Sequence, residues 1–231
     1  MKELLSNETF IFYAILALCL VIMYVPVIGK YVRVLETMIH ESGHVLMALL
    51  TGVRIRKINL FSDTSGETHI IAVGKIKPML IAWAGYPFSS AMTWLSFRAI
   101  HSGYKQLFII ILCIITLVFL IAYIRNGFGI CWAISFILIN GYFLYDKNAA
   151  VINVLAMIYV DILFLSSLFS CFIILYLSFK RPDQAGDATL IGRIIHIPPQ
   201  IIAIIFVVLC GMISLSILEN FFPLFDNLKL F

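Results

Sequence analysis

The sequence predicts an all-α polytopic membrane protein with about seven transmembrane helices and one small β-hairpin. Composition is the first reason: of 231 residues, 62% are hydrophobic and 12% are charged, and the mean hydropathy is +1.06. Water-soluble domains do not reach such values. The second reason is that the apolar residues form runs of about 20, enough to cross roughly 30 Å of hydrocarbon. We therefore expect a single membrane domain over residues 1–231.

Short polar links separate the apolar runs. The first run, residues 10–29, lacks the basic start and the small-residue cleavage site of a signal peptide, and is predicted to be a span. A polar break at Lys30 to Arg33 is expected to follow, and Gly52 is expected to end the second helix as a C-cap glycine. The other predicted spans are residues 34–51, 78–97, 106–124, 128–145, 150–178 and 199–218.

One segment departs from the helical pattern. Residues 53–73 are rich in β-branched side chains, carry charges, and are interrupted by Asp63-Thr64-Ser65-Gly66, a strong turn signal. This pattern predicts a β-hairpin at the membrane surface. Two roles stay open: a connector that packs on lipid headgroups, or an edge strand that pairs with an extended substrate peptide.

The charge pattern points to a bilayer as partner. The formal charge of +4 is spread over the span ends, so it favours headgroup contacts and gives nucleic-acid binding no support. When successive links are assigned to alternate sides of the membrane, from Lys2 to Lys229, more basic residues fall on the side of the N-terminus. This distribution favours a cytoplasmic N-terminus. The five cysteines occur singly, without a CxxC pair, and are predicted to be packing residues.

The most informative motif is His40-Glu41-Ser42-Gly43-His44. Residues four apart lie on one face of a helix, so both imidazoles can bind one Zn²⁺. Glu41 can then take the proton of a zinc-bound water, whose pKa the metal lowers to about 7. Random order of this composition gives only about 0.003 such matches. A structural polar cluster is the alternative, but it is costly in a lipid-embedded helix unless a metal ion satisfies it.

A catalytic zinc needs a third protein ligand and an open position for water. Two carboxylates qualify. Asp187 follows a break after the sixth run, where a new helix could begin, whereas Asp161 lies in the middle of that run, where an ionisable residue is a functional candidate by default. The remaining histidines, His69, His101 and His196, occur singly and are expected at the surface or the membrane interface.

Other segments along the chain support the zinc motif. They are TMIHESGHVLMALLTG (37–52), the charged hairpin, Ala84-Gly85-Tyr86, Arg125-Asn126-Gly127-Phe128-Gly129, and Gly186-Asp187-Ala188-Thr189-Leu190 followed by Ile197-Pro198-Pro199. From residue 34 to about 215 the chain thereby resembles the small membrane zinc metallopeptidases of the site-2 protease clan, in the branch without added domains. The Asn-Pro and Leu-Asp-Gly sequences of the larger members are absent, and Pro87-Phe88-Ser89-Ser90 replaces the usual Gly-Pro.

The resemblance implies an intramembrane zinc metalloprotease with one Zn²⁺ held by His40, His44 and Asp187, and with Glu41 as catalytic base. It also implies membrane-embedded or membrane-proximal protein substrates and an integral, multi-pass location in the cytoplasmic membrane of a prokaryote. The main alternative is a catalytically inactive zinc-binding membrane protein that acts as a partner-binding or regulatory scaffold. A transporter is less compatible, because no repeat or pair of broken helices is detectable.

Overall fold

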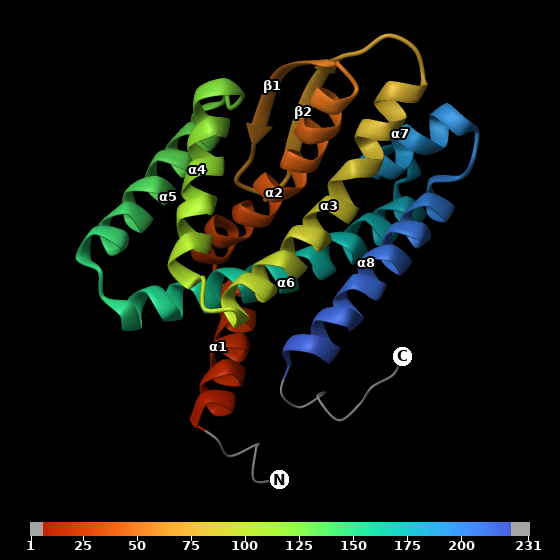
Figure 1. Ribbon diagram of the computed structural model, residues 1–231. Helices are drawn as coiled ribbons and strands as arrows, with labels where there is room; N and C mark the ends of the chain where they lie inside the picture. Colours follow the sequence, from red (N-terminus) through yellow and green to blue (C-terminus); the bar gives the residue numbers. More distant parts are fainter. Residues whose placement is uncertain (1–6, 223–231) are drawn as a thin grey trace.

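The computed structural model describes residues 7–222, so Lys2 and Lys229 lie outside the described residues (Figure 1). Within this range the chain is mainly α-helical, with one two-stranded sheet. The elements in order are α1 (Asn7–Tyr24), α2 (Ile28–Leu50), β1 (Arg54–Leu60), β2 (Gly66–Ile71), α3 (Ile76–His101), α4 (Lys105–Ala122), α5 (Gly127–Asp146), α6 (Ala149–Lys180), a 3₁₀ turn η2 (Pro182–Gln184), α7 (Gly186–Ile195) and α8 (Pro199–Phe221).

The break between the first two helices lies earlier than the sequence predicted. The expected polar break at Lys30 to Arg33 is wrong, because both residues belong to α2. The chain instead turns at Pro26, whose ring cannot continue the helix. Val27 just after it has a φ of 68°. As a result α1 and α2 meet at an angle of 104°, and Ile15, Cys19 and Met23 of α1 pack in a core shared with α6.

All of the predicted apolar runs form helices, but fewer of them qualify as membrane spans. By length and composition, the described residues contain four candidate spans, α4, α5, α6 and α8, or five if the bent pair of α1 and α2 forms one span. The sequence predicted about seven. α2 does not qualify as a membrane span by itself because it carries charged residues. α3 does not qualify because polar residues, including Ser89, Ser90 and Thr93, lie among its apolar residues. The helical membrane class and the hairpin are confirmed.

The predicted hairpin forms directly after α2. Gly52 adopts a φ of 65° and donates to the Leu49 carbonyl at 3.1 Å, while Val53 donates to Ala48 at 2.7 Å. These two bonds form a Schellman motif, which confirms Gly52 as the C-cap glycine and turns the chain back along the helix. β1 and β2 pair antiparallel, with Leu60 opposite Gly66.

The outer edge of β1 is occupied. Ile58 donates to the Tyr123 carbonyl at 2.8 Å, and the Asn126 side chain bonds both the N–H and the carbonyl of Leu60. The link between α4 and α5 therefore satisfies the backbone of the buried end of β1, as backbone groups shielded from water require. The described residues give the outer edge of β2 no such partner strand.

α2 and α3 pack at backbone distance through Gly43. A Cβ built at Gly43 would lie 2.7 Å from the Cβ of Phe88 and 2.8 Å from the Ala84 carbonyl oxygen. Because the second contact is backbone, it cannot yield by rotation of a side chain. Small residues at such crossings are typical of helix packing in membranes.

Gly43→Ala is expected to lower stability by about 1–3 kcal/mol, because the added methyl overpacks the α2–α3 crossing. Gly141→Ala in α5 is the matched control, since a Cβ there meets nothing within 4 Å. The control should keep or raise stability by up to about 1 kcal/mol through helix propensity. Thermal unfolding in detergent measures both. Equal midpoints for the two variants would contradict the close crossing.

Candidate metal centre

The candidate site lies along one face of α2. A cavity of about 720 Å³ opens between this helix, the hairpin, α3, α6 and α7. The spacing of the α2 residues that line it follows the 3.6-residue period of a helix, so their side chains form one continuous stripe. They are Arg33, Glu36, Thr37, His40, Glu41 and His44.

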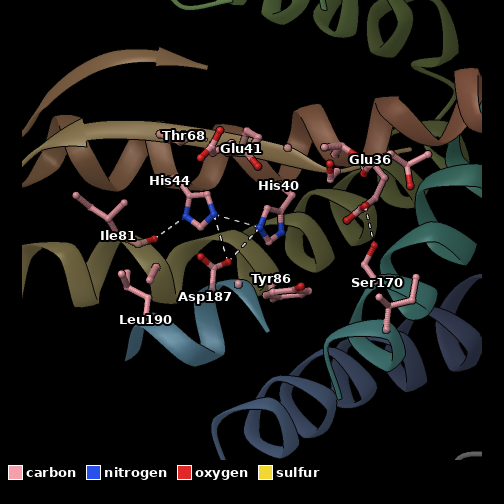
Figure 2. Close-up of a pocket in the computed structure, with 18 of the residues that line it drawn as sticks. Glu36, His40, Glu41, His44, Thr68, Ile81, Tyr86, Ser170, Asp187 and Leu190 are labelled. Atoms are coloured by element: carbon pink, nitrogen blue, oxygen red, sulfur yellow. Dashed lines mark hydrogen bonds and ion pairs between the residues drawn. The ribbon is translucent and has the colours of Figure 1, made fainter. Parts of the chain in front are cut away.

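Three donor atoms converge in the middle of this stripe, as Figure 2 shows. The Nε2 atoms of His40 and His44 lie 3.1 Å apart, and Oδ2 of Asp187 lies 3.3 Å and 3.4 Å from them. A tetrahedral zinc ion with bonds of about 2.0–2.1 Å separates its ligand atoms by about 3.3 Å. The three observed separations match the edges of that tetrahedron, so the donor set fits a zinc ion.

The surroundings hold the two imidazoles in a ligating orientation. Nδ1 of His44 donates to the Ile81 carbonyl oxygen of α3 at 2.7 Å, so Nε2 faces the other two donors and could bind a metal after giving up any proton. The ring of Tyr86 packs edge-on to His40, with centroids 4.6 Å apart. A Cβ at Gly85 would come within 2.5 Å of the His40 ring. The absence of a side chain at Gly85 therefore provides the space that the imidazoles occupy.

Asp187 reaches the histidines from the first turn of α7, where a carboxylate is favoured by the helix dipole. Thr189 fixes this helix start: its hydroxyl donates to the Pro182 carbonyl at 2.5 Å and accepts from the Ala185 N–H at 3.0 Å. Burial raises the pKa of the Asp187 carboxyl, but the adjacent His44 and His40 outweigh this effect and hold the pKa below its ordinary value. The donor set thus contains an ionised carboxylate.

Glu41 lies beside the donors and is 4% exposed. Its Oε2 accepts a hydrogen bond from the hydroxyl of Thr68 in the middle of β2. Gly66 of the same strand lies against this carboxylate. A Cβ at Gly66 would collide with Oε1 of Glu41. The hairpin thereby covers the carboxylate and fixes its orientation relative to the histidines (Figure 2).

The second carboxylate considered from sequence is located elsewhere. Asp161 is fully buried in α6, its two oxygens have no hydrogen-bond partner among the described residues, and it does not line the cavity. The other histidines also lie apart from the donors. His69 pairs with Glu67 on the hairpin at 2.9 Å, and His101 and His196 are exposed.

Sequence reasoning missed several residues of the site. Thr68 and the Ile81 carbonyl belong to segments whose position relative to α2 no local pattern reveals. Glu36 had a usable signal, because it is a charged residue in an apolar helix, one turn before His40 on the same face. Ser89 of α3 is buried and its hydroxyl donates to Glu36 at 2.8 Å.

Comparison with known proteins agrees with this geometry. No curated protein and no solved structure matches the chain. A family model described as Peptidase M50B-like matches residues 13–217, which include the HExxH helix, the hairpin and Asp187. This match covers most of the chain. The chain therefore belongs to the Peptidase M50B-like family, a family of site-2 protease-type intramembrane metalloproteases.

Proposed function

We propose that this protein is an intramembrane zinc metalloendopeptidase. The observation that carries the proposal is the triangle of donor atoms from His40, His44 and Asp187, with the carboxylate of Glu41 next to it on the same helix face. Family membership and the several long apolar helices support the same assignment. We place the protein in the cytoplasmic membrane of a prokaryote.

Each residue of the site has a proposed role. His40, His44 and Asp187 would hold one zinc ion, which when bound acidifies water and polarises a peptide carbonyl. Glu41 accepts the proton of the attacking water and later delivers it to the leaving amine, so one carboxylate serves both transfers. Thr68 keeps the Glu41 carboxylate aimed at the donors through its hydroxyl. Glu41 is 4% exposed and lines the cavity, so its carboxylate faces the cavity and is largely screened from the protein surface.

The proposed substrate is a membrane protein that unwinds locally at the site. A helical substrate shields its peptide bonds, so an extended stretch has to form and needs hydrogen-bond partners. β2 supports this function: Gly66, Glu67, Thr68 and Ile70 of this strand line the cavity, and the outer edge of β1 is already used by the link after α4. We therefore favour the edge-strand role of the hairpin over a connector on lipid headgroups.

The ligand assignment predicts a difference between two aspartates. Asp187→Ala should lower the zinc content of the purified protein well below one ion per chain, because only two donors remain. Asp161→Ala should keep zinc stoichiometric, because that carboxylate does not reach the cavity. Elemental analysis of both detergent-solubilised variants measures the outcome. Full zinc in Asp187→Ala would remove this residue from the ligand set.

The catalytic assignment predicts the behaviour of Glu41→Gln. This variant should bind zinc like wild type and lose at least about 100-fold in hydrolysis, the contribution typical of a general base. The measurement is cleavage of a single-span model protein in detergent or liposomes. A chelator should abolish cleavage by wild type, and added zinc should restore it. If wild type holds zinc and cleaves nothing, the inactive scaffold is the better description.

A further inference from the structure

The polar stripe of α2 continues beyond the metal donors to Glu36. This carboxylate is 4% exposed and accepts hydrogen bonds from Ser89 of α3 at 2.8 Å and from Ser170 of α6 at 3.0 Å. An ionised carboxylate has about four acceptor positions, so the two serines leave part of its capacity unused. Glu36 and Ser170 both line the cavity, where a bound molecule could use that capacity.

Arg33 adds a donor at the same end of the cavity. It precedes Glu36 by three residues on the same face and also lines the cavity. Its Nε is buried and has no hydrogen-bond partner among the described residues. None of the ion pairs formed by the described residues involves Arg33 or Glu36. A guanidinium without an ion-pair partner and a carboxylate with unused acceptor capacity are costly at such a position unless a ligand completes them.

The opposite end of the cavity is apolar. Figure 2 shows Glu36 and Ser170 on one side of the metal donors, and Ile81 and Leu190 on the other. The cavity is therefore chemically asymmetric about the donors. The apolar wall residues beyond His44 are Ile70, Ala72, Pro78, Ile81 and Ala82.

The polar end best fits a neutral group that both donates and accepts hydrogen bonds. A cationic side chain would meet the guanidinium of Arg33, and an anionic one would meet the carboxylate of Glu36, at a depth where charges are costly. A carboxamide avoids both conflicts. Its NH₂ can donate to Glu36 while its carbonyl accepts from Arg33.

Helix geometry limits where this group lies in a substrate. Along the helix axis, Glu36 lies about 6 Å before His40, and Arg33 lies about 10 Å before His40. An extended peptide advances about 3.3 Å per residue. We propose that Glu36 and Arg33 form a specificity subsite for an Asn or Gln side chain two to three residues from the scissile bond, with apolar residues preferred on the other side. This inference rests on the proposed protease function.

The test compares matched single-span substrates that carry Asn, Leu, Lys or Asp at each position within three residues of the cut. Asn and Leu have similar shape, so their comparison isolates hydrogen bonding. For wild type, Asn at one position should raise kcat/KM about tenfold over Leu, whereas Lys and Asp should give no gain. Combined Arg33→Met and Glu36→Gln should reduce that preference to about one while the Leu substrate is still cleaved.

Controls separate specificity from stability. Glu219→Gln makes the same chemical change in α8, away from the cavity, and should keep the Asn preference. Zinc content and unfolding midpoint of the double variant identify a merely structural loss, which would slow all substrates equally. Peptide binding to zinc-loaded Glu41→Gln protein, followed by fluorescence anisotropy, provides a readout without turnover and should show the same Asn preference.

The outcomes distinguish the two proposals. Cleavage of all substrates with no Asn preference, or a preference that survives in the double variant, overturns the subsite and leaves the protease function standing. An equal loss on every substrate in the double variant also overturns it. If wild type binds zinc but neither cleaves nor binds any substrate, both proposals fall.

Discussion

The structure depends on placing a polar stripe on one face of α2 within a protein whose solvent is lipid. Ionisable groups at that depth are tolerated only when neighbours satisfy them. The neighbours come from every side: the Ile81 carbonyl for His44, Thr68 for Glu41, and two serines for Glu36. The rest of the bundle is arranged so that these partners reach one helix face. Removing any of them would leave a buried polar group uncompensated.

The hairpin is positioned by both of its ends. The Schellman motif at Gly52 reverses the chain at the end of α2, and the Thr37 hydroxyl donates to the Thr64 carbonyl of the turn at 2.8 Å. Asn126 holds β1 from the other side. β2 is therefore held against α2 at Thr37 and Glu41, which explains how a surface segment can orient the Glu41 carboxylate.

Local signals accounted for much of this architecture. Hydrophobic runs located the helices, the Asp63 to Gly66 turn located the hairpin, and the HExxH spacing placed two imidazoles on one face. The predicted position of the break between the first two helices was wrong, because the polar residues after Pro26 belong to α2, where Arg33 lines the cavity. The choice between Asp161 and Asp187 required three-dimensional contacts, since both carboxylates have plausible sequence contexts. The same is true of Thr68, whose role follows only from strand placement.

The third donor links the early and late parts of the chain. Asp187 follows His44 by more than 140 residues, and its helix is held by Thr189 and by the packing of Ala188 and Ile191 against α3 and α8. A ligand that contacts both segments only in the folded state stabilises that state by its binding free energy. A zinc ion would therefore have a structural role as well as a catalytic one, because it would also hold α7 against α2. The site and the closure of the helix bundle around it then depend on the same three donors.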